Sequence, residues 1–261
     1  AGKLPMDVIS ELVGVPEPDR AELRRLSDLL VHREEGVMDV PPAGMEAALI
    51  LAGYYADMIA DRRANPTDDL TSALTQVDVD GEHLSDDDIT SFLFLMVVAG
   101  NETTTKLLGN AWYWGWRNPD QRAIPFDEPA RIVDWVEETL RYDTSSQVLA
   151  RVTTTDVGLR GSTIPKGDRV LLLVGSANRD EDVFPAADRY DLDRDTSDLV
   201  SFGFGRHFCM GASLARLEAR VCLEELVARI ADYDVDPDGI ERVHSVNVRG
   251  FATLPTTVTA R

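Results

Sequence analysis

Apolar residues recur every three or four positions over several long stretches of the chain, which is the spacing of one face of an α-helix. In residues 16–30, Pro16 and Asp19 precede the apolar Leu23, Leu26 and Leu30. Proline and an acidic residue at the start are typical of a helix N-terminus. Similar patterns predict further helices over residues 42–66, 84–116, 127–142 and 210–233.

The predicted helix over 84–116 differs from the others because its apolar residues cover nearly every face. Ser85 is the expected N-cap, and three aspartates follow in the first turn, where negative charge complements the helix dipole. A helix that is apolar all round belongs in the interior of a protein. We therefore expect residues 84–116 to lie in the middle of the protein.

Residues 148–178 are rich in Val, Thr and Leu and are interrupted by Gly161, Pro165 and Gly167. This composition predicts two or three strands joined by tight turns. The chain shows no repeat, low-complexity tract or convincing linker. The predicted fold is therefore mainly α with a small β component, in a single domain over residues 1–261.

Charge and composition narrow the classes of partner. The chain has 46 acidic and 26 basic residues and a net charge of −20, which disfavours nucleic acid and anionic membranes as partners. Its apolar runs are far shorter than the ~18 residues that span a bilayer, so no membrane segment is expected. Cys209 and Cys222 are its two cysteines. So few cysteines disfavour a disulfide framework and favour a reducing, cytoplasmic setting.

The middle of the long apolar helix contains residues that a helix interior disfavours. The stretch AGNETTT, Ala99 to Thr105, includes a glycine, which costs about 1 kcal/mol relative to alanine in a helix. A threonine that bonds back to a carbonyl one turn earlier would explain part of this pattern. Alternatively, Glu102 and the neighbouring hydroxyls supply an acid and an alcohol in apolar surroundings, which suits proton delivery. The residues alone leave both interpretations open.

The segment FGFGRHFCMG, residues 202–211, surrounds Cys209 with glycines and aromatic rings. Its glycines allow backbone conformations that other residues avoid and a close approach to a flat partner. Cys209 stands just before a predicted helix N-terminus, a position that stabilises a thiolate. A nucleophilic cysteine, a zinc site and a phosphate-binding loop each lack the partner residues or the spacing that they need.

Three motifs occur in a fixed order: AGNET at 99–103, Glu138-x-x-Arg141, and the cysteine segment. Together they resemble the cytochrome P-450 family, the haem-thiolate monooxygenases, of the soluble bacterial kind. By itself, Glu-x-x-Arg would be taken for a surface salt bridge. The resemblance covers the whole chain and implies the cytochrome P-450 fold, incomplete at the N-terminus, with haem b as cofactor.

The resemblance also implies roles for single residues. Cys209 would be the axial ligand of the haem iron, inside a loop shaped by Phe202, Gly203 and Gly211, and His207 and Arg151 would pair with the haem propionates. Further implied roles are an oxygen groove, a proton-delivering pair and a structural triad, assigned respectively to Ala99 and Gly100, to Glu102 and Thr103, and to Glu138, Arg141 and Arg189.

Substrate and partners follow from the same resemblance. Val98, Val148 and Phe251 would contact an apolar small-molecule substrate, although ordinary core packing explains them equally well. Dioxygen would be the oxidant, and electrons would come from a ferredoxin and its reductase, docked on a basic patch of Arg206, Arg216 and Arg220. Two alternatives stay open, a peroxide-driven peroxygenase and a truncated, non-catalytic haem-binding remnant.

Overall fold

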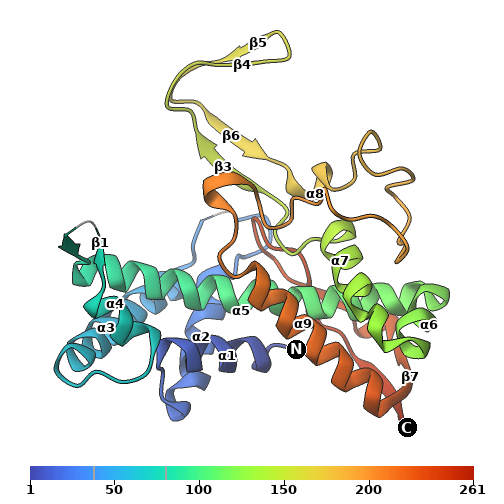
Figure 1. Ribbon diagram of the computed structural model, residues 1–261, viewed down its shortest axis with the longest axis horizontal. Helices are drawn as coiled ribbons and strands as arrows, with labels where there is room; N and C mark the ends of the chain where they lie inside the picture. The colour runs from blue at the N-terminus through green and yellow to red at the C-terminus, as the bar shows by residue number, and fades with distance from the viewer. Residues whose placement is uncertain (38, 80) are drawn as a thin grey trace. The chain divides into compact units, whose positions relative to one another are not determined.

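The structure is a computed structural model that describes residues 1–37, 39–79 and 81–261. Helices dominate the described residues (Figure 1). The α-helices are α1 Lys3–Val13, α2 Glu17–Val31, α3 Pro42–Ala64, α4 Leu70–Gln76, α5 Asp86–Arg117, α6 Pro119–Asp127, α7 Ile132–Tyr142, α8 Val174–Ala177 and α9 Ala212–Arg229. The described residues also form short 3₁₀ turns, which are η1 Pro129–Arg131, η2 Gly205–His207 and η3 Pro237–Gly239.

The strands of the described residues form antiparallel pairs. The pairs are β1 Asp78–Val79 with β2 Glu82–His83, β3 Leu149–Val152 with β6 Arg169–Leu172, β4 Val157–Leu159 with β5 Ser162–Ile164, β7 Ile230–Val235 with β10 Thr256–Ala260, and β8 Glu241–Arg242 with β9 Phe251–Thr253. Figure 1 shows the β4–β5 hairpin extending outward from the β3–β6 pair. The prediction of a mainly helical fold with a small β component is confirmed.

The contacts of the chain group into two compact units, and each is described here by itself. Unit 1 consists of residues 1–106 and 243–246, and unit 2 of residues 107–242 and 247–261. The division falls inside α5, after Lys106. The expectation of one domain over residues 1–261 stays a prediction.

Unit 1 packs α1 to α4 and the first part of α5 around an apolar core. Tyr55 of α3 and Ile89 and Leu93 of α5 are completely buried there. The start of α5 is capped as predicted, because Ser85 Oγ accepts a hydrogen bond from the Asp88 amide while the Asp88 carboxylate accepts one from the Ser85 hydroxyl, at 3.1 and 2.6 Å. This reciprocal cap fixes where the long helix begins.

Unit 2 has an aromatic core built from α5, α7 and β7. The ring of Trp112 stacks on Tyr233 at 3.7 Å between centroids and on Trp135 at 6.3 Å. Stacked rings add to the stability that burial of their area provides. This core supports α7 and α9, the two helices next to the cysteine segment.

The helix predicted over 210–233 is shorter in the structure. Helix α9 ends at Arg229, and the next six residues form strand β7, which pairs with β10. Long-range pairing with residues 256–260 therefore overrides the helical spacing at this end. Over the described residues, no helix is both long and apolar enough to cross a bilayer.

Candidate functional site

The cysteine segment of unit 2, residues 202–211, forms a tight loop that contains η2 and leads into α9. The amide of Cys209 donates a hydrogen bond to the carbonyl of Phe202 at 2.9 Å, and the amide of Phe208 donates to the carbonyl of Gly205 at 3.0 Å. Gly203 and Gly205 have φ values of 73° and 66°, in the left-handed region that favours glycine. Gly203 and Gly205 therefore give the loop backbone conformations that other residues avoid.

Little room remains on the inner side of this loop. A Cβ atom on Gly203 would lie 3.3 Å from the carbonyl oxygen of His207, and one on Gly211 would lie 3.8 Å from Cys209 Sγ. A side chain at Gly203 would crowd the loop backbone, whereas the distance at Gly211 is an ordinary van der Waals contact. At Gly203 the loop therefore depends on glycine for space as well as for its dihedral angle.

Cys209 is exposed, and its neighbours are large apolar side chains that are exposed too. The exposed fractions of Phe204, Phe208 and Met210 are 88%, 53% and 71%. A thiol among exposed apolar groups offers a soft ligand beside a surface that water solvates poorly. This donor and these surroundings fit haem, a flat apolar group whose iron binds thiolate.

The two residues expected to pair with haem propionates come from separate elements of unit 2. His207 is exposed at the end of η2, two residues before Cys209. Arg151 is half-buried on β3, and its guanidinium donates to the carbonyl of Ala150 at 2.8 Å. Arg151 supplies a guanidinium and His207 an exposed ring, and their assignment to propionates stays a prediction.

In unit 1, α5 carries the AGNET motif, and its residues point in different directions. The hydroxyl of Thr103 donates to the carbonyl of Ala99 at 2.8 Å, the back-bond considered from the sequence. Ala99 is exposed, and Val98 and Thr103 are half-buried. Gly100 instead packs on α1, because a Cβ there would lie 3.1 Å from Ile9 Cγ1. Helix packing therefore accounts for the glycine that was expected to line an oxygen groove.

Glu102 lies on a buried side of α5 and has a partner that the sequence reading missed. Lys106 Nζ lies 3.1 Å from Glu102 Oε2, and the two side chains are 8% and 10% exposed. No directed hydrogen bond from the described residues reaches this oxygen, so the contact is an attraction between charges. The i, i+4 spacing of Glu102 and Lys106 was the feature of the sequence that could have indicated this ion pair.

Glu138 and Arg141 of α7 form a buried pair in unit 2, with distances of 2.7 Å from Arg141 Nε and Nη2 to the two carboxylate oxygens. The guanidinium also donates to the carbonyls of Asn178, Ala187 and Arg189, at 2.9 to 3.0 Å. Both side chains are almost fully buried, with exposed fractions of 1% and 0%. The motif is therefore no surface salt bridge but a joint that ties α7 to residues 178–189.

The third member of the expected triad needs a correction. Arg189 is exposed and supplies only its backbone carbonyl to Arg141. The second guanidinium near Glu138 belongs to Arg194, whose Nε lies 3.5 Å from Glu138 Oε1 and whose side chain is 7% exposed. Arg189 and Arg194 both lie within residues 185–194. The fold of this segment buries the side chain of Arg194 and leaves that of Arg189 exposed.

Two of the expected substrate positions lie in unit 2. Phe251 is 7% exposed on β9, with the Arg242 guanidinium 3.8 Å and the Tyr113 ring 4.8 Å from its own ring centre. Val148 is half-buried, just before β3. The surroundings of Phe251 are those of a core residue, the alternative that the sequence left open.

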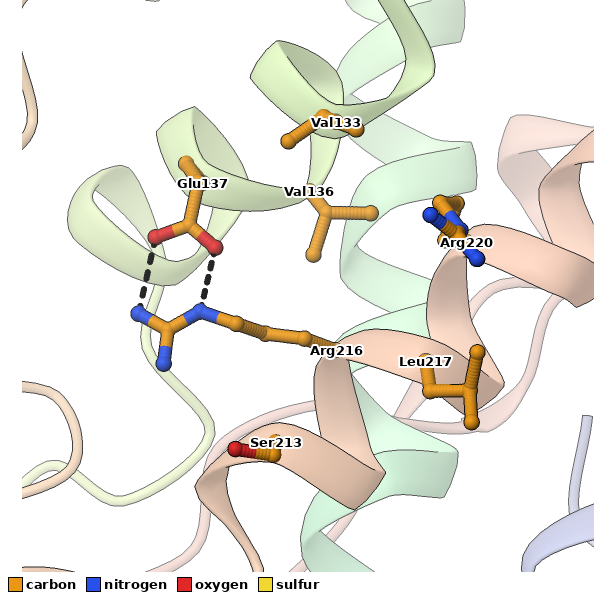
Figure 2. A pocket seen from close by; sticks show the side chains of 7 residues that line it. All are labelled: Val133, Val136, Glu137, Ser213, Arg216, Leu217 and Arg220. Atoms are coloured by element: carbon orange, nitrogen blue, oxygen red, sulfur yellow. Dashed lines mark hydrogen bonds and ion pairs between the residues drawn. The ribbon is translucent and has the colours of Figure 1, made fainter.

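A groove of about 290 Å³ lies between α7 and α9 in unit 2. Figure 2 shows the Arg216 guanidinium reaching across to Glu137, at 2.5 and 2.9 Å, with Arg220 one turn further along α9. Arg220 is itself 3.6 Å from Glu224. Two arginines of the expected basic patch are thus paired with carboxylates, which weakens the field of the patch.

Comparison with known proteins places the chain in a family. The family model for Cytochrome P-450 matches residues 132–256. A Mycobacterium tuberculosis protein described as cytochrome P-450 123 is 59% identical over 262 residues, which is 100% of this chain and 65% of that protein. Vitamin D(3) 25-hydroxylase of Pseudonocardia autotrophica is 40% identical over 100% of this chain and 64% of its own length.

The solved structures agree. Substrate-free CYP109E1 from Bacillus megaterium is similar with a TM-score of 0.91 and 32% identity, over 98% of this chain and 68% of that one. The chain spans about 65% of the length of the curated relatives named above. The chain belongs to the cytochrome P-450 family and has the cytochrome P-450 fold over the part that it covers.

Proposed function

We propose that this protein is a haem-thiolate monooxygenase that oxidises an apolar small organic molecule. The observation that carries the proposal is the Cys209 loop, in which an exposed sulfur sits among exposed apolar side chains and glycines before a helix N-terminus. Cys209 would hold haem b through its sulfur, with His207 and Arg151 as cations for the propionates. Haem b, when bound, supplies the iron at which dioxygen is activated.

Different residues of the chain would position the cysteine, deliver protons and keep the fold rigid around this cofactor. The Phe202 carbonyl bond and the two left-handed glycines hold Cys209 in place, so its sulfur is positioned before any ligand arrives. Glu102 would hold a proton on its carboxyl group, and Thr103 would pass it on at Oγ1. The Glu138–Arg141 pair would keep the segment before the cysteine loop rigid.

Exposed apolar side chains on α5 support the proposed substrate class. Leu95 is 57% exposed, Ala99 is exposed one turn later, and Val98 beside it is half-buried. Exposed apolar side chains in the middle of this helix favour an apolar partner molecule. The hydroxylase among the relatives is named for vitamin D3, which is also apolar.

The first test is the carbon monoxide difference spectrum of the reduced protein. The wild type is expected to show the strongly red-shifted Soret band of thiolate-bound ferrous haem, and Cys209→Ser is expected to lose it. Cys222→Ser is the matched control, because Cys222 is the other cysteine and lies partly buried on α9. A red-shifted band that survives in Cys209→Ser would overturn the proposal.

The same preparation distinguishes the modes of oxidation. Product formed with NADPH, ferredoxin and reductase supports a monooxygenase, and product formed only with peroxide supports a peroxygenase. Haem binding with product from neither would point to a non-catalytic haem-binding protein. The haem content of each preparation is measured before these assays.

We further propose that an acidic ferredoxin docks beside the Cys209 loop, at Arg206 and Arg220. Arg216 contributes less, because Glu137 already neutralises it. Arg220→Glu is therefore expected to raise the KM for ferredoxin several-fold, and Arg216→Glu to raise it less. Equal effects, or none, would contradict this docking surface.

A further inference from the structure

Arg216 makes two contacts in unit 2 that the proposed docking surface does not explain. Its Nε and Nη2 donate to the two carboxylate oxygens of Glu137 on α7, at 2.5 and 2.9 Å (Figure 2). Its Cζ atom also lies 4.5 Å from the centre of the Phe202 ring, at the start of the cysteine segment. One guanidinium therefore joins α7, α9 and the loop that carries Cys209.

Phe202 is the residue on which this loop closes. Its carbonyl accepts the hydrogen bond of the Cys209 amide at 2.9 Å. The residue before it is held as well, because Ser201 Oγ donates to the Leu140 carbonyl of α7 at 2.6 Å. Arg216 contacts the ring of Phe202, so the backbone and the side chain of this residue both have partners.

The planar shape of the guanidinium allows both contacts of Arg216 at once. Its edge donates two bonds to a carboxylate, while its face stacks on an aromatic ring. A cation within about 6 Å of a ring centre is attracted to the ring face, and partial removal from water strengthens this attraction. The side chains of Glu137 and Arg216 are 20% and 36% exposed, and Phe202 is half-buried. The contacts of Arg216 are therefore stronger than those of an arginine in open solvent.

Arg220, one turn further along α9, is arranged differently. Its Nε lies 3.6 Å from Glu224 of the same helix, and both side chains are 47% exposed. Such an exposed pair contributes little to stability, and this contact joins α9 to no second element. The comparison indicates that Arg216 ties the loop to α7, whereas Arg220 is a charge on the surface.

We infer that Arg216 is the positioning residue of the Cys209 loop: with Glu137 it anchors the Phe202 ring to α7, and so keeps the Cys209 amide on the Phe202 carbonyl. The inference rests on the proposed function for its purpose, because a sulfur held in one place is ready to bind iron. The role depends on the shape of the guanidinium and not on its charge alone.

The first experiment follows, by NMR, hydrogen exchange of the Cys209 amide in the full chain before haem is added. Arg216→Met removes both contacts and is expected to speed this exchange about five- to tenfold, because the loop opens more often. Phe202→Leu should have the same effect, and Phe202→Tyr, which keeps a ring, should exchange like the wild type. Arg229→Met is the matched control, because this arginine of α9 pairs with Glu225 at an exposed position.

Two further variants separate shape from charge. Arg216→Lys keeps the positive charge and loses the planar fork, so exchange should be as fast as in Arg216→Met. The double variant of Arg216→Met and Phe202→Leu should exchange no faster than either single variant, because both changes remove the same contact. The amide of Leu223, a buried residue of α9, reports global unfolding and should keep its wild-type rate. Wild-type exchange in Arg216→Met, recovery in Arg216→Lys, or independent effects in the double variant would each overturn the inference.

The second experiment records the carbon monoxide spectrum of the haem-loaded protein. The ratio of the red-shifted Soret band to the band at the ordinary position should fall several-fold in Arg216→Met and in Phe202→Leu. It should keep the wild-type value in Phe202→Tyr and in Arg229→Met. Haem content and thermal midpoint are measured for every variant, because a purely structural role would lower these two quantities and leave the ratio unchanged.

The two experiments distinguish the possible failures. A wild type without the red-shifted band would overturn the proposed function, and the exchange rates would still decide whether Arg216 orders the loop. Faster exchange in Arg216→Met together with a wild-type band ratio would overturn the positioning of the iron ligand, while the proposed function would stand.

Discussion

Two buried acid–base pairs on helices, one in each unit, are built in opposite ways. In unit 2, both oxygens of Glu138 bond to Arg141, and Oε1 also accepts the amide of Asp191 at 2.9 Å. In unit 1, Lys106 Nζ lies 3.1 Å from Glu102 Oε2. The spacing along the helix is similar, i, i+3 against i, i+4. The pair in unit 2 is held in addition by several hydrogen bonds to the backbone.

The difference indicates two kinds of role. A buried ion pair with all of its donors and acceptors satisfied fixes the fold around it, and removal of one partner leaves a buried charge. The Glu102–Lys106 pair lies within a single helix, so it joins no second segment to α5 through the contact at 3.1 Å. Glu218 of α9 is a third case, because burial raises its pKa to about 7 and its Oε2 has no hydrogen-bond partner among the described residues.

The largest effect is expected from Arg141→Met. This change removes both guanidinium bonds to the buried Glu138, leaving it Arg194 at 3.5 Å as its remaining cation, and removes the donors of the Asn178, Ala187 and Arg189 carbonyls. The free energy of unfolding should fall by about 3–5 kcal/mol, measured by urea titration. Arg141→Lys should be nearly as damaging, because an ammonium cannot replace the planar guanidinium. A loss below about 1 kcal/mol would remove the contrast between the two pairs.

Glu218→Gln should change how stability depends on pH. The pKa of Glu218 in the folded state is raised from 4.5 to about 7, so the folded state binds its proton more tightly than the unfolded state. The wild type should therefore lose stability as pH rises from 4.5 to 7, by up to about 3 kcal/mol, and the variant should not. Glu225→Gln, at an exposed position of α9, should keep the wild-type profile. Parallel profiles for wild type and Glu218→Gln would contradict this.

Arg194 and Arg189 provide a paired test of the corrected triad. Arg194→Met removes the 3.5 Å contact with Glu138 and the bonds to the carbonyls of Pro185 and Ala186, and should lower the free energy of unfolding by about 2 kcal/mol. Arg189→Met should change it by less than about 0.5 kcal/mol, because that side chain is exposed. The reverse order would restore the original assignment.

The smallest change in stability is expected for Lys106→Met. Removal of the ammonium should lower the free energy of unfolding by about 1 kcal/mol, because the change removes the 3.1 Å ion pair with Glu102. Urea titration measures the difference. A loss as large as that of Arg141→Met would mean that both pairs are structural to the same degree.

The long helices and the motifs were predictable from the sequence, because the patterns that specify them lie within short segments. Periodic apolar residues indicated α2, α3, α5, α7 and α9, and Ser85 with its aspartates indicated where α5 begins. Helices α1, α4, α6 and α8 were not anticipated, and α4 has only seven residues, too few to show a period. The end of α9 depended on strand pairing with distant residues, which no local pattern contains.

Within the site, the residue types were predictable and their partners were not. Cys209 and Glu138-x-x-Arg141 are recognised from motifs that fix their spacing. Arg194 and Lys106 are ordinary charged residues, and only the folded backbone selects which of many such side chains is buried beside an acid. For Gly100, the motif indicated the residue but not its packing. Its close contact with Ile9 leaves little room for a side chain at this position.

The exposed sulfur atoms of the cysteine loop set a limit on how long the haem-free protein can persist in air. Cys209 and Met210 are adjacent, and Met210 is 71% exposed. Oxidants convert an accessible methionine to its sulfoxide and carry an accessible thiolate past sulfenic acid to forms that cellular reductants do not recover. Haem must therefore bind before these side chains oxidise. A preparation that receives haem slowly accumulates oxidised chains that haem added later cannot restore.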